Sequence, residues 1–155
     1  MIPFGDPSAS YQAHKSEIDQ AIKRVLDSGW YVLGTEVEAF EKEFASFHGK
    51  DLHAVGVANG TDAIALCLRG LDLGIGDEVI TPSHTAVATV AGIEQAGCIP
   101  VFADIDPNTR CISSDSITEN LSCNTRAIMP VHIYGQPAEM YKILEIAKAH
   151  KLAVV

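Results

Sequence analysis

A short apolar run, Ala54–Ala58, stops at Asn59-Gly60-Thr61-Asp62-Ala63 and gives way to leucines at helical spacing. A strand that runs into a glycine lets the backbone approach an anion closely, because no side chain stands in the way. A threonine at the start of the next helix adds a hydroxyl to amide groups that the helix cannot pair itself. The junction therefore predicts a phosphate-binding turn. A plain tight turn with an N-cap fits equally well, since the longer Gly-x-Gly-x-x-Gly fingerprint is absent.

From residue 53 onward, short runs rich in Val and Ile alternate with helical patterns. We expect strands near residues 53–58, 78–81, 99–103, 126–131 and 152–155, and helices at 61–71, 84–96, 114–121 and 137–150. Strands that are apolar throughout, each followed by a helix, are typical of a parallel sheet covered on both faces. The expected fold class is a three-layer α/β sandwich with a mostly parallel central sheet. Pro137 is expected at the first position of the last helix.

The first 50 residues have a different pattern, which predicts an extended, proline-bearing arm and two amphipathic helices. The first helix repeats apolar residues from Ile18 to Leu26 and ends at Gly29. The second begins with Thr35–Glu38, which matches a capping box, and ends at Gly49. Its phenylalanines recur at helical spacing and place one apolar stripe along it.

The composition excludes several classes of protein. A net charge of −9 with scattered basic residues argues against nucleic-acid binding. Four cysteines without paired spacing indicate reduced thiols and a cytoplasmic location. The sequence shows neither an export signal nor an apolar run of membrane-spanning length, so we expect a soluble protein that binds no membrane.

Polar residues gather where the predicted strands end, which is where open α/β sheets bind ligands. The segments are Asn59–Ala63, Pro82–Thr85, Asp104–Pro107 and His132–Gln136. Taken alone, His84 fits a helix-start residue, and His132 a hydrogen-bonded residue of the core or rim. Asp104 and Asp106 resemble a pair of carboxylates, but the Asp-Pro-Asn context favours a turn. The other histidines lack metal-ligand spacing, so no metal site is predicted.

Several motifs in the same order resemble the sugar-nucleotide aminotransferases of the DegT/StrS type. They are Gly29–Gly34, Gly60–Ala63, Gly76–Ile80, Pro82–Thr89, Pro100–Asp106 and Pro130–Pro137. Together they extend over nearly the whole chain. The resemblance implies the large domain of a fold-type I enzyme, similar to aspartate aminotransferase, that depends on pyridoxal 5'-phosphate. Such enzymes are normally homodimers and move an amino group, usually from glutamate, onto a keto-sugar linked to a nucleoside diphosphate.

The resemblance also implies roles for particular residues. Gly60 and Thr61, with Asp62 through its backbone, match the segment that holds the cofactor phosphate. Ala86 stands at the position that is usually aromatic, so His84 becomes the planar candidate for stacking on the cofactor ring. The catalytic residue is unknown, because none of the seven lysines matches the motif of the internal lysine that anchors the cofactor.

We therefore expect residues 1–34 to form an arm and helix, and residues 35–155 to form a cofactor-binding domain that continues past Val155. On that expectation the isolated chain supplies the phosphate-binding half of a site and is inactive alone. Two alternatives stay open at this stage. One is a fragment that binds pyridoxal phosphate or phosphate without catalysis, and the other is a sugar dehydratase of the same family.

Overall fold

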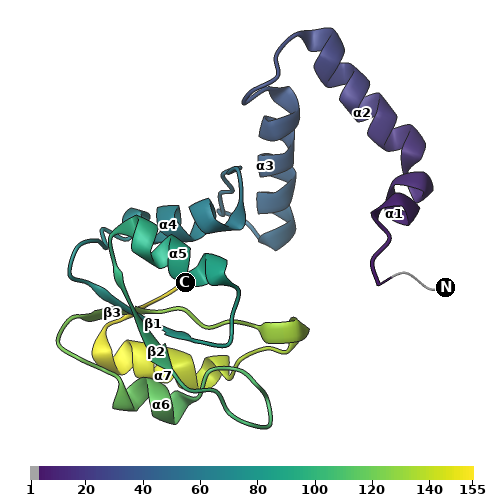
Figure 1. Ribbon diagram of the computed structural model, residues 1–155. Helices are drawn as coiled ribbons and strands as arrows, with labels where there is room; N and C mark the ends of the chain where they lie inside the picture. Colours follow the sequence, from purple (N-terminus) through teal and green to yellow (C-terminus); the bar gives the residue numbers. More distant parts are fainter. Residues whose placement is uncertain (1–3) are drawn as a thin grey trace. The chain divides into compact units, whose positions relative to one another are not determined.

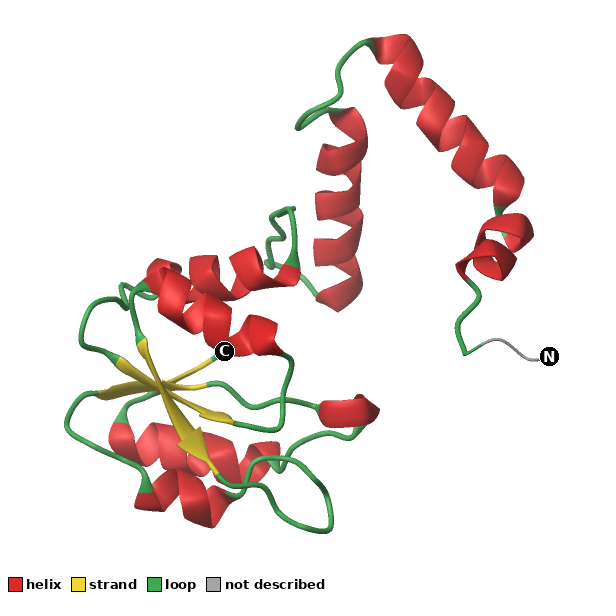
Figure 2. Ribbon diagram, viewed as in Figure 1, coloured by secondary structure: helices red, strands yellow, loops and turns green. Residues whose placement is uncertain are grey.

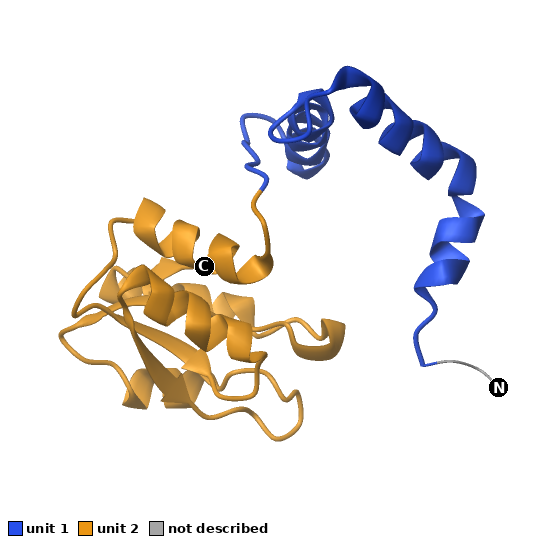
Figure 3. Ribbon diagram, turned by 45° about the horizontal axis from the view of Figure 1, so that its top comes forward, with its two compact units in different colours: residues 1–56 blue, residues 57–155 orange. Residues whose placement is uncertain are grey.

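The structure, a computed structural model, describes residues 4–155. Contacts within the chain divide it into two compact units, Met1–Gly56 (unit 1) and Val57–Val155 (unit 2), which Figure 3 colours separately. The sequence analysis predicted a different division, between residues 34 and 35, for the large domain of the whole enzyme. That division stays a prediction.

The described part of unit 1 contains three helices: α1 (Pro7–Ala13), α2 (Lys15–Ser28) and α3 (Thr35–His48). The predicted helix that ends at Gly29 is confirmed as α2, and Gly29 adopts the left-handed conformation that stops it, with φ of 66°. The extended arm was wrong from Pro7 onward, where α1 begins. The Asp6 carboxylate accepts a hydrogen bond from the Ala9 amide and Pro7 takes the first helical position, so the two residues together start this helix. Residues 1–3 of the expected arm lie outside the described residues.

The second predicted helix is confirmed as α3, but its capping box is not formed. Gly34 is the N-cap and no side chain caps the helix. The Glu38 carboxylate accepts a hydrogen bond from Lys42 one turn later, at 2.6 Å, instead of reaching back to the helix start. Glu36 is likewise engaged, by Arg24 of α2 at 2.7 Å. Competing ion pairs therefore explain why the local sequence pattern did not produce the predicted cap.

Unit 2 alternates helices with a four-stranded parallel sheet, drawn in yellow in Figure 2. Its elements are α4 (Gly60–Gly70), β1 (Glu78–Pro82), α5 (Val87–Ala96), β2 (Ile99–Ala103), α6 (Ser114–Glu119), β3 (Thr125–Ile128), the 3-10 turn η1 (Ile133–Gly135), α7 (Met140–His150) and β4 (Ala153–Val154). The strand order is β2-β1-β3-β4. The register of β1 against β3 shifts between Glu78 and Val79, which leaves Arg126 without a partner in the ladder.

Neighbouring residues on each central strand point to opposite faces of the sheet, and each face has its own core. Val79 of β1 and Ala127 of β3 pack with apolar side chains of α4 and α5. Ile80 and Ile128, the next residues along, pack with side chains of α6 and α7. Figure 1 shows these two pairs of helices on the two faces of the sheet. The predicted three-layer sandwich is confirmed.

One predicted strand and two predicted helix starts were wrong, and the strand predicted over 126–131 ends at Ile128. Residues 53–58 form no strand, because no neighbouring strand among residues 4–155 pairs with them, and a strand needs such a partner. The helix predicted from residue 84 begins at Val87, after a bend at Ser83–Thr85. Pro137 is not in a helix, since α7 begins at Met140. The Ala138 amide donates to His132 Nδ1 at 3.1 Å, and the Met140 amide donates to the Ala138 carbonyl at 2.7 Å in a tight turn that precedes the helix.

Candidate functional site

The strand order places a reversal of the chain path between β1 and β3. From β1 the chain passes through α5 to β2 on one side, and from β2 it returns through α6 to β3 on the other side. The helices that follow β1 and β3 therefore cover opposite faces of the sheet. Ligands of doubly wound sheets bind at such a reversal, beyond the carboxyl ends of the strands. The candidate site therefore lies in the segments that follow Pro82 and Ile128.

These two segments meet through His84 and Tyr134. Their ring centroids lie 5.7 Å apart with the planes inclined at 68°, so one ring presents its edge to the other. His84 Nε2 is buried and has no hydrogen-bond partner among residues 4–155. Buried ring nitrogens are normally paired, so an orphaned one beside an open loop suits a site that a ligand completes.

The backbone around this pair is held from both strands. The Thr81 hydroxyl donates to the Met129 carbonyl at 3.0 Å, which joins the end of β1 to the residue after β3. The Thr85 and Thr89 hydroxyls lie 2.8 Å apart and connect the His84 bend to the first turn of α5. His132 is confirmed as a hydrogen-bonded residue of the rim, since its Nδ1 accepts from Ala138.

Tyr134 is the site residue that the sequence analysis did not assign. It stands in η1 with φ of 55°, and Gly135 follows with φ of 80°. A tyrosine in the left-handed region costs about 1 kcal/mol, so the fold holds it there against its preference. The only signal in the sequence was a Tyr-Gly pair just after a predicted strand, in the segment already singled out as polar.

The start of α4 offers the predicted anion site. Neither the Gly60 nor the Thr61 amide has a hydrogen-bond partner among residues 4–155. A Cβ added at Gly60 would meet nothing within 4 Å, so the backbone there is open to an approaching group. Unpaired amides at the start of an eleven-residue helix favour a negative charge through both hydrogen bonding and the helix dipole.

Asp62 is placed differently from its two neighbours. Its amide donates to the Asn59 side-chain oxygen at 2.9 Å, so Asn59 acts as the N-cap. Its carboxylate accepts from Asn59 Nδ2 at 2.9 Å and from Gln95 Nε2 at 3.2 Å. Gly60 and Thr61 therefore hold the free donors of this turn, whereas the Asp62 amide is already engaged.

Close packing of α4 on α5 holds this turn in place. A Cβ added at Gly92 of α5 would lie 2.7 Å from Ile64 Cγ2 and 2.9 Å from the Thr61 carbonyl oxygen. Only glycine allows the two helices to approach this closely. The helix α5, against which this turn is packed, follows directly after the His84 bend.

Asp106, one of the remaining polar candidates, has a structural role. Asp106 Oδ1 accepts from the amides of Asn108 and Thr109, at 2.8 Å each, which confirms the predicted turn. These two backbone hydrogen bonds lower the pKa of Asp106.

All seven lysines are exposed. No group of three or more His, Cys, Asp or Glu side chains within residues 4–155 is arranged to hold a metal ion.

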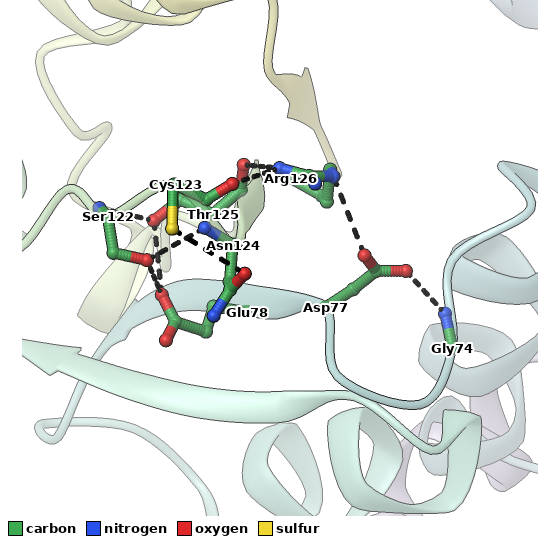
Figure 4. Close-up of polar contacts among 8 residues, drawn as sticks. All are labelled: Gly74, Asp77, Glu78, Ser122, Cys123, Asn124, Thr125 and Arg126. Carbon is green, nitrogen blue, oxygen red and sulfur yellow. Dashed lines mark hydrogen bonds and ion pairs between the residues drawn. The ribbon is translucent and has the colours of Figure 1, made fainter.

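The amino end of the sheet contrasts with the carboxyl end, because its polar groups pair with one another (Figure 4). Glu78 accepts hydrogen bonds from the Ser122 and Thr125 hydroxyls. Arg126, at the bulge, pairs with Asp77 at 3.5 Å and donates to the Cys123 carbonyl at 2.8 Å. These groups therefore pair with one another beside the register shift between β1 and β3.

Comparisons with known proteins identify the family to which the chain is similar. The profile of the DegT/DnrJ/EryC1/StrS aminotransferase family matches residues 12–155. Over its whole length the chain is 46% identical to a dTDP-3-amino-3,6-dideoxy-alpha-D-galactopyranose transaminase of Aneurinibacillus thermoaerophilus, of which it covers 42%. Over 99% of its length it is 45% identical to a dTDP-3-amino-3,4,6-trideoxy-alpha-D-glucose transaminase of Streptomyces venezuelae, of which it covers 40%.

Solved structures show the same likeness. The crystal structure of DesV from S. venezuelae superimposes with a TM-score of 0.94 at 44% identity, over 99% of this chain and 41% of that one. NtdA from Bacillus subtilis, with bound cofactor PMP, gives 0.86 at 36% identity, over 92% of this chain and 32% of that one. The chain thus spans about two fifths of the length of the curated relatives it matches first.

None of the helices described for residues 4–155 has the length and apolar character that a membrane crossing requires.

Proposed function

Because the chain belongs to the DegT/DnrJ/EryC1/StrS aminotransferase family, we propose that it provides the phosphate-binding part of a site for pyridoxal 5'-phosphate. The reaction proposed for the whole enzyme is transamination of a keto-sugar linked to a nucleoside diphosphate, in amino-sugar and surface-polysaccharide biosynthesis. Glutamate is the proposed amino donor. Relatives named as transaminases of dTDP-sugars support the substrate class.

The observation that carries this proposal is the pair of unpaired amides at Gly60 and Thr61, with open space above Gly60. A phosphate dianion is the charge that such a helix start favours. The Thr61 hydroxyl adds a further donor. The residues present therefore fit the cofactor's phosphate, even though the protein carries a net charge of −9.

Each proposed residue then has a physical role. Gly60 and Thr61 donate to the phosphate, and Asp62 contributes its amide if the Asn59 side chain yields it. His84 presents its ring to the pyridine ring, which accounts for a side chain held between two loops with an unpaired nitrogen. When bound, the cofactor supplies an electron-withdrawing ring that allows an amino group to pass between amino acid and sugar.

For the complete enzyme we also propose a homodimer and a cytoplasmic location. For the chain of residues 1–155, binding without turnover is the second candidate. The observation that favours it is that every lysine is exposed, on a helix or just beyond one, and none stands among the site residues described above. Both candidates require that the chain bind the cofactor's phosphate.

Binding of pyridoxamine 5'-phosphate tests the proposal without any covalent anchor. Its intrinsic fluorescence, followed during titration of the 155-residue chain, reports the dissociation constant. We expect Thr61→Val, which removes the hydroxyl at nearly constant volume, to weaken binding roughly tenfold or more, because a hydrogen bond to a charged group contributes about 1.5–3 kcal/mol. Gly60→Ala is expected to weaken it similarly, since the methyl group fills the space left for the phosphate.

The matched control is Gly70→Ala, the same substitution at the other end of α4, where an added Cβ also meets nothing within 4 Å. It should leave the dissociation constant unchanged. Pyridoxamine, which lacks the phosphate, should bind far more weakly than its phosphate ester. Equal binding of the two compounds would refute the phosphate-binding role of this turn.

A further inference from the structure

Tyr134 and His84 come from the loops that follow two adjacent central strands, and their rings are in edge contact at 5.7 Å. The side chain of Tyr134 is otherwise open, with 82% of the residue exposed. His84 is the more enclosed of the two, and its Nε2 is buried without a partner among the described residues. The ring of the exposed tyrosine therefore packs against one side of the enclosed His84 ring.

The backbone at Tyr134 is arranged so as to produce this contact. Two successive left-handed residues, Tyr134 and Gly135, turn the chain sharply within η1. Glycine adopts this conformation at no cost, whereas tyrosine does so at about 1 kcal/mol. His132 Nδ1, through the Ala138 amide, ties down the far side of the same loop. Costly backbone conformations of this kind gather at functional sites.

We infer that Tyr134 is a positioning residue: its ring sets the orientation of the His84 imidazole, so that His84 is preorganised as the planar surface for the ring of the bound cofactor. This inference rests on the proposed function. Tyr134 itself acts through His84 and needs no contact with the phosphate. Because the contact is made by the aromatic ring, the tyrosine hydroxyl is dispensable.

The experiment compares two probes on the same variants. Pyridoxamine 5'-phosphate reports phosphate and ring binding together, and inorganic phosphate, measured as its competitor, reports the Gly60 turn alone. An aromatic pair of this kind is worth about 0.5–1.5 kcal/mol, which converts to a twofold to tenfold effect. Tyr134→Leu should therefore weaken pyridoxamine 5'-phosphate binding by about that factor and leave the inorganic-phosphate constant unchanged. Tyr134→Phe, which keeps the ring, should restore the unaltered value.

Two further variants separate positioning from folding. Tyr141→Leu makes the same substitution at a tyrosine of α7 that is 90% exposed, and it should change neither constant. In the His84→Ala background, Tyr134→Leu should have no further effect, because Tyr134 acts only through His84. Circular dichroism of each variant confirms that it is folded. If Tyr134→Leu is not folded, Tyr134→Asn, which also lacks the ring but tolerates the left-handed conformation, carries the test.

The possible failures are distinguishable. If Tyr134→Leu weakens both probes equally, or neither, the positioning role is overturned while the phosphate site stands. The positioning role is also overturned if Tyr134→Phe behaves like Tyr134→Leu, or if the effects of His84→Ala and Tyr134→Leu simply add. If the unaltered chain binds neither probe, the proposed function and this inference fall together.

Discussion

Unit 2 buries two apolar clusters against the two faces of its sheet, whereas the three helices of unit 1 bury none of their residues. Both units nevertheless form helices with well-defined ends. In unit 1 the helices depend on local interactions, such as the ion pairs within α2 and α3 and the Phe40–Phe44 ring contact at 5.6 Å. Local signals therefore suffice to specify a helix, but burial requires elements that are distant in the sequence.

The largest expected difference between the units is in hydrogen exchange. Isolated helices of about 14 residues are marginal in water, and the local stability of a segment depends on what it buries. We expect amides of β1 and β3 to exchange at least about a thousand times more slowly than those of α2 and α3, because opening the sheet disrupts both cores. Exchange followed by mass spectrometry on the intact chain measures this. Similar protection in α2 and in β1 would show that the comparison is wrong.

Truncation of apolar side chains should give the next largest contrast. Ile80 is fully buried in the core beneath α6 and α7, whereas Phe47 of α3 is 85% exposed. Ile80→Ala should lower the free energy of unfolding by about 2–5 kcal/mol, because it leaves a cavity. Phe47→Ala, which removes a larger side chain, should change it by less than about 0.5 kcal/mol. Urea unfolding of both variants provides the measurement, and a larger loss for Phe47→Ala would reverse the assignment of the cores.

The structural features that depend on short-range sequence patterns were predicted correctly. Val79 and Ile80, adjacent apolar residues in a short run, correctly indicated a strand buried on both faces, and the helices that follow such runs indicated a parallel sheet. The Gly60-Thr61 turn and the start of α4 were found in the same way. The family resemblance rested on motifs within unit 2 for the most part, and the profile match over residues 12–155 confirmed it.

The errors arose where a partner outside the local pattern decides the outcome. Residues 53–58 have the composition of a strand, but a strand forms only beside another strand. The sequence Thr35–Glu38 matches a capping box, but Glu38 pairs with Lys42 instead of capping the helix. Glu36 pairs with Arg24 of α2. The contact of Tyr134 with His84 joins residues far apart in the sequence, and no local pattern reports it.

A smaller effect is expected where unit 2 joins its core to the candidate site. Gly92→Ala would bring a methyl group within 3 Å of Ile64 and of the Thr61 carbonyl, so α4 must move away from α5. Overpacking of this kind costs about 1–3 kcal/mol of unfolding free energy. Because Thr61 lies in the turn proposed to bind phosphate, the variant should also bind pyridoxamine 5'-phosphate more weakly. Gly70→Ala, which meets no neighbour, should be neutral or slightly stabilising; a neutral Gly92→Ala would show that the helices do not need this close approach.

The smallest expected effect is on the pH dependence of the unfolding free energy. It comes from a buried thiol, a group that unit 1 lacks. Burial among the side chains beneath α4 and α5 raises the pKa of Cys98 above its usual value of 9.0, and the negative charge of Asp77 raises it further. In the unfolded chain the thiol ionises at its ordinary pKa, but in the folded chain it stays neutral to higher pH. The stability contributed by the neutral thiol is therefore complete below about pH 9 and is lost as the pH rises toward the folded-state pKa.

Urea unfolding of the unaltered chain and of Cys98→Ala between about pH 7 and pH 10 isolates this contribution. The substitution itself costs stability at every pH, so the slope against pH is the informative quantity. All other titrating groups are common to both proteins, and the unaltered chain should lose stability more steeply above about pH 9 than Cys98→Ala does. Identical slopes would mean that the thiol is as accessible to water in the folded chain as in the unfolded one. The core beneath α4 and α5 would then be more open than its packing indicates, and unit 2 would differ from unit 1 only in degree.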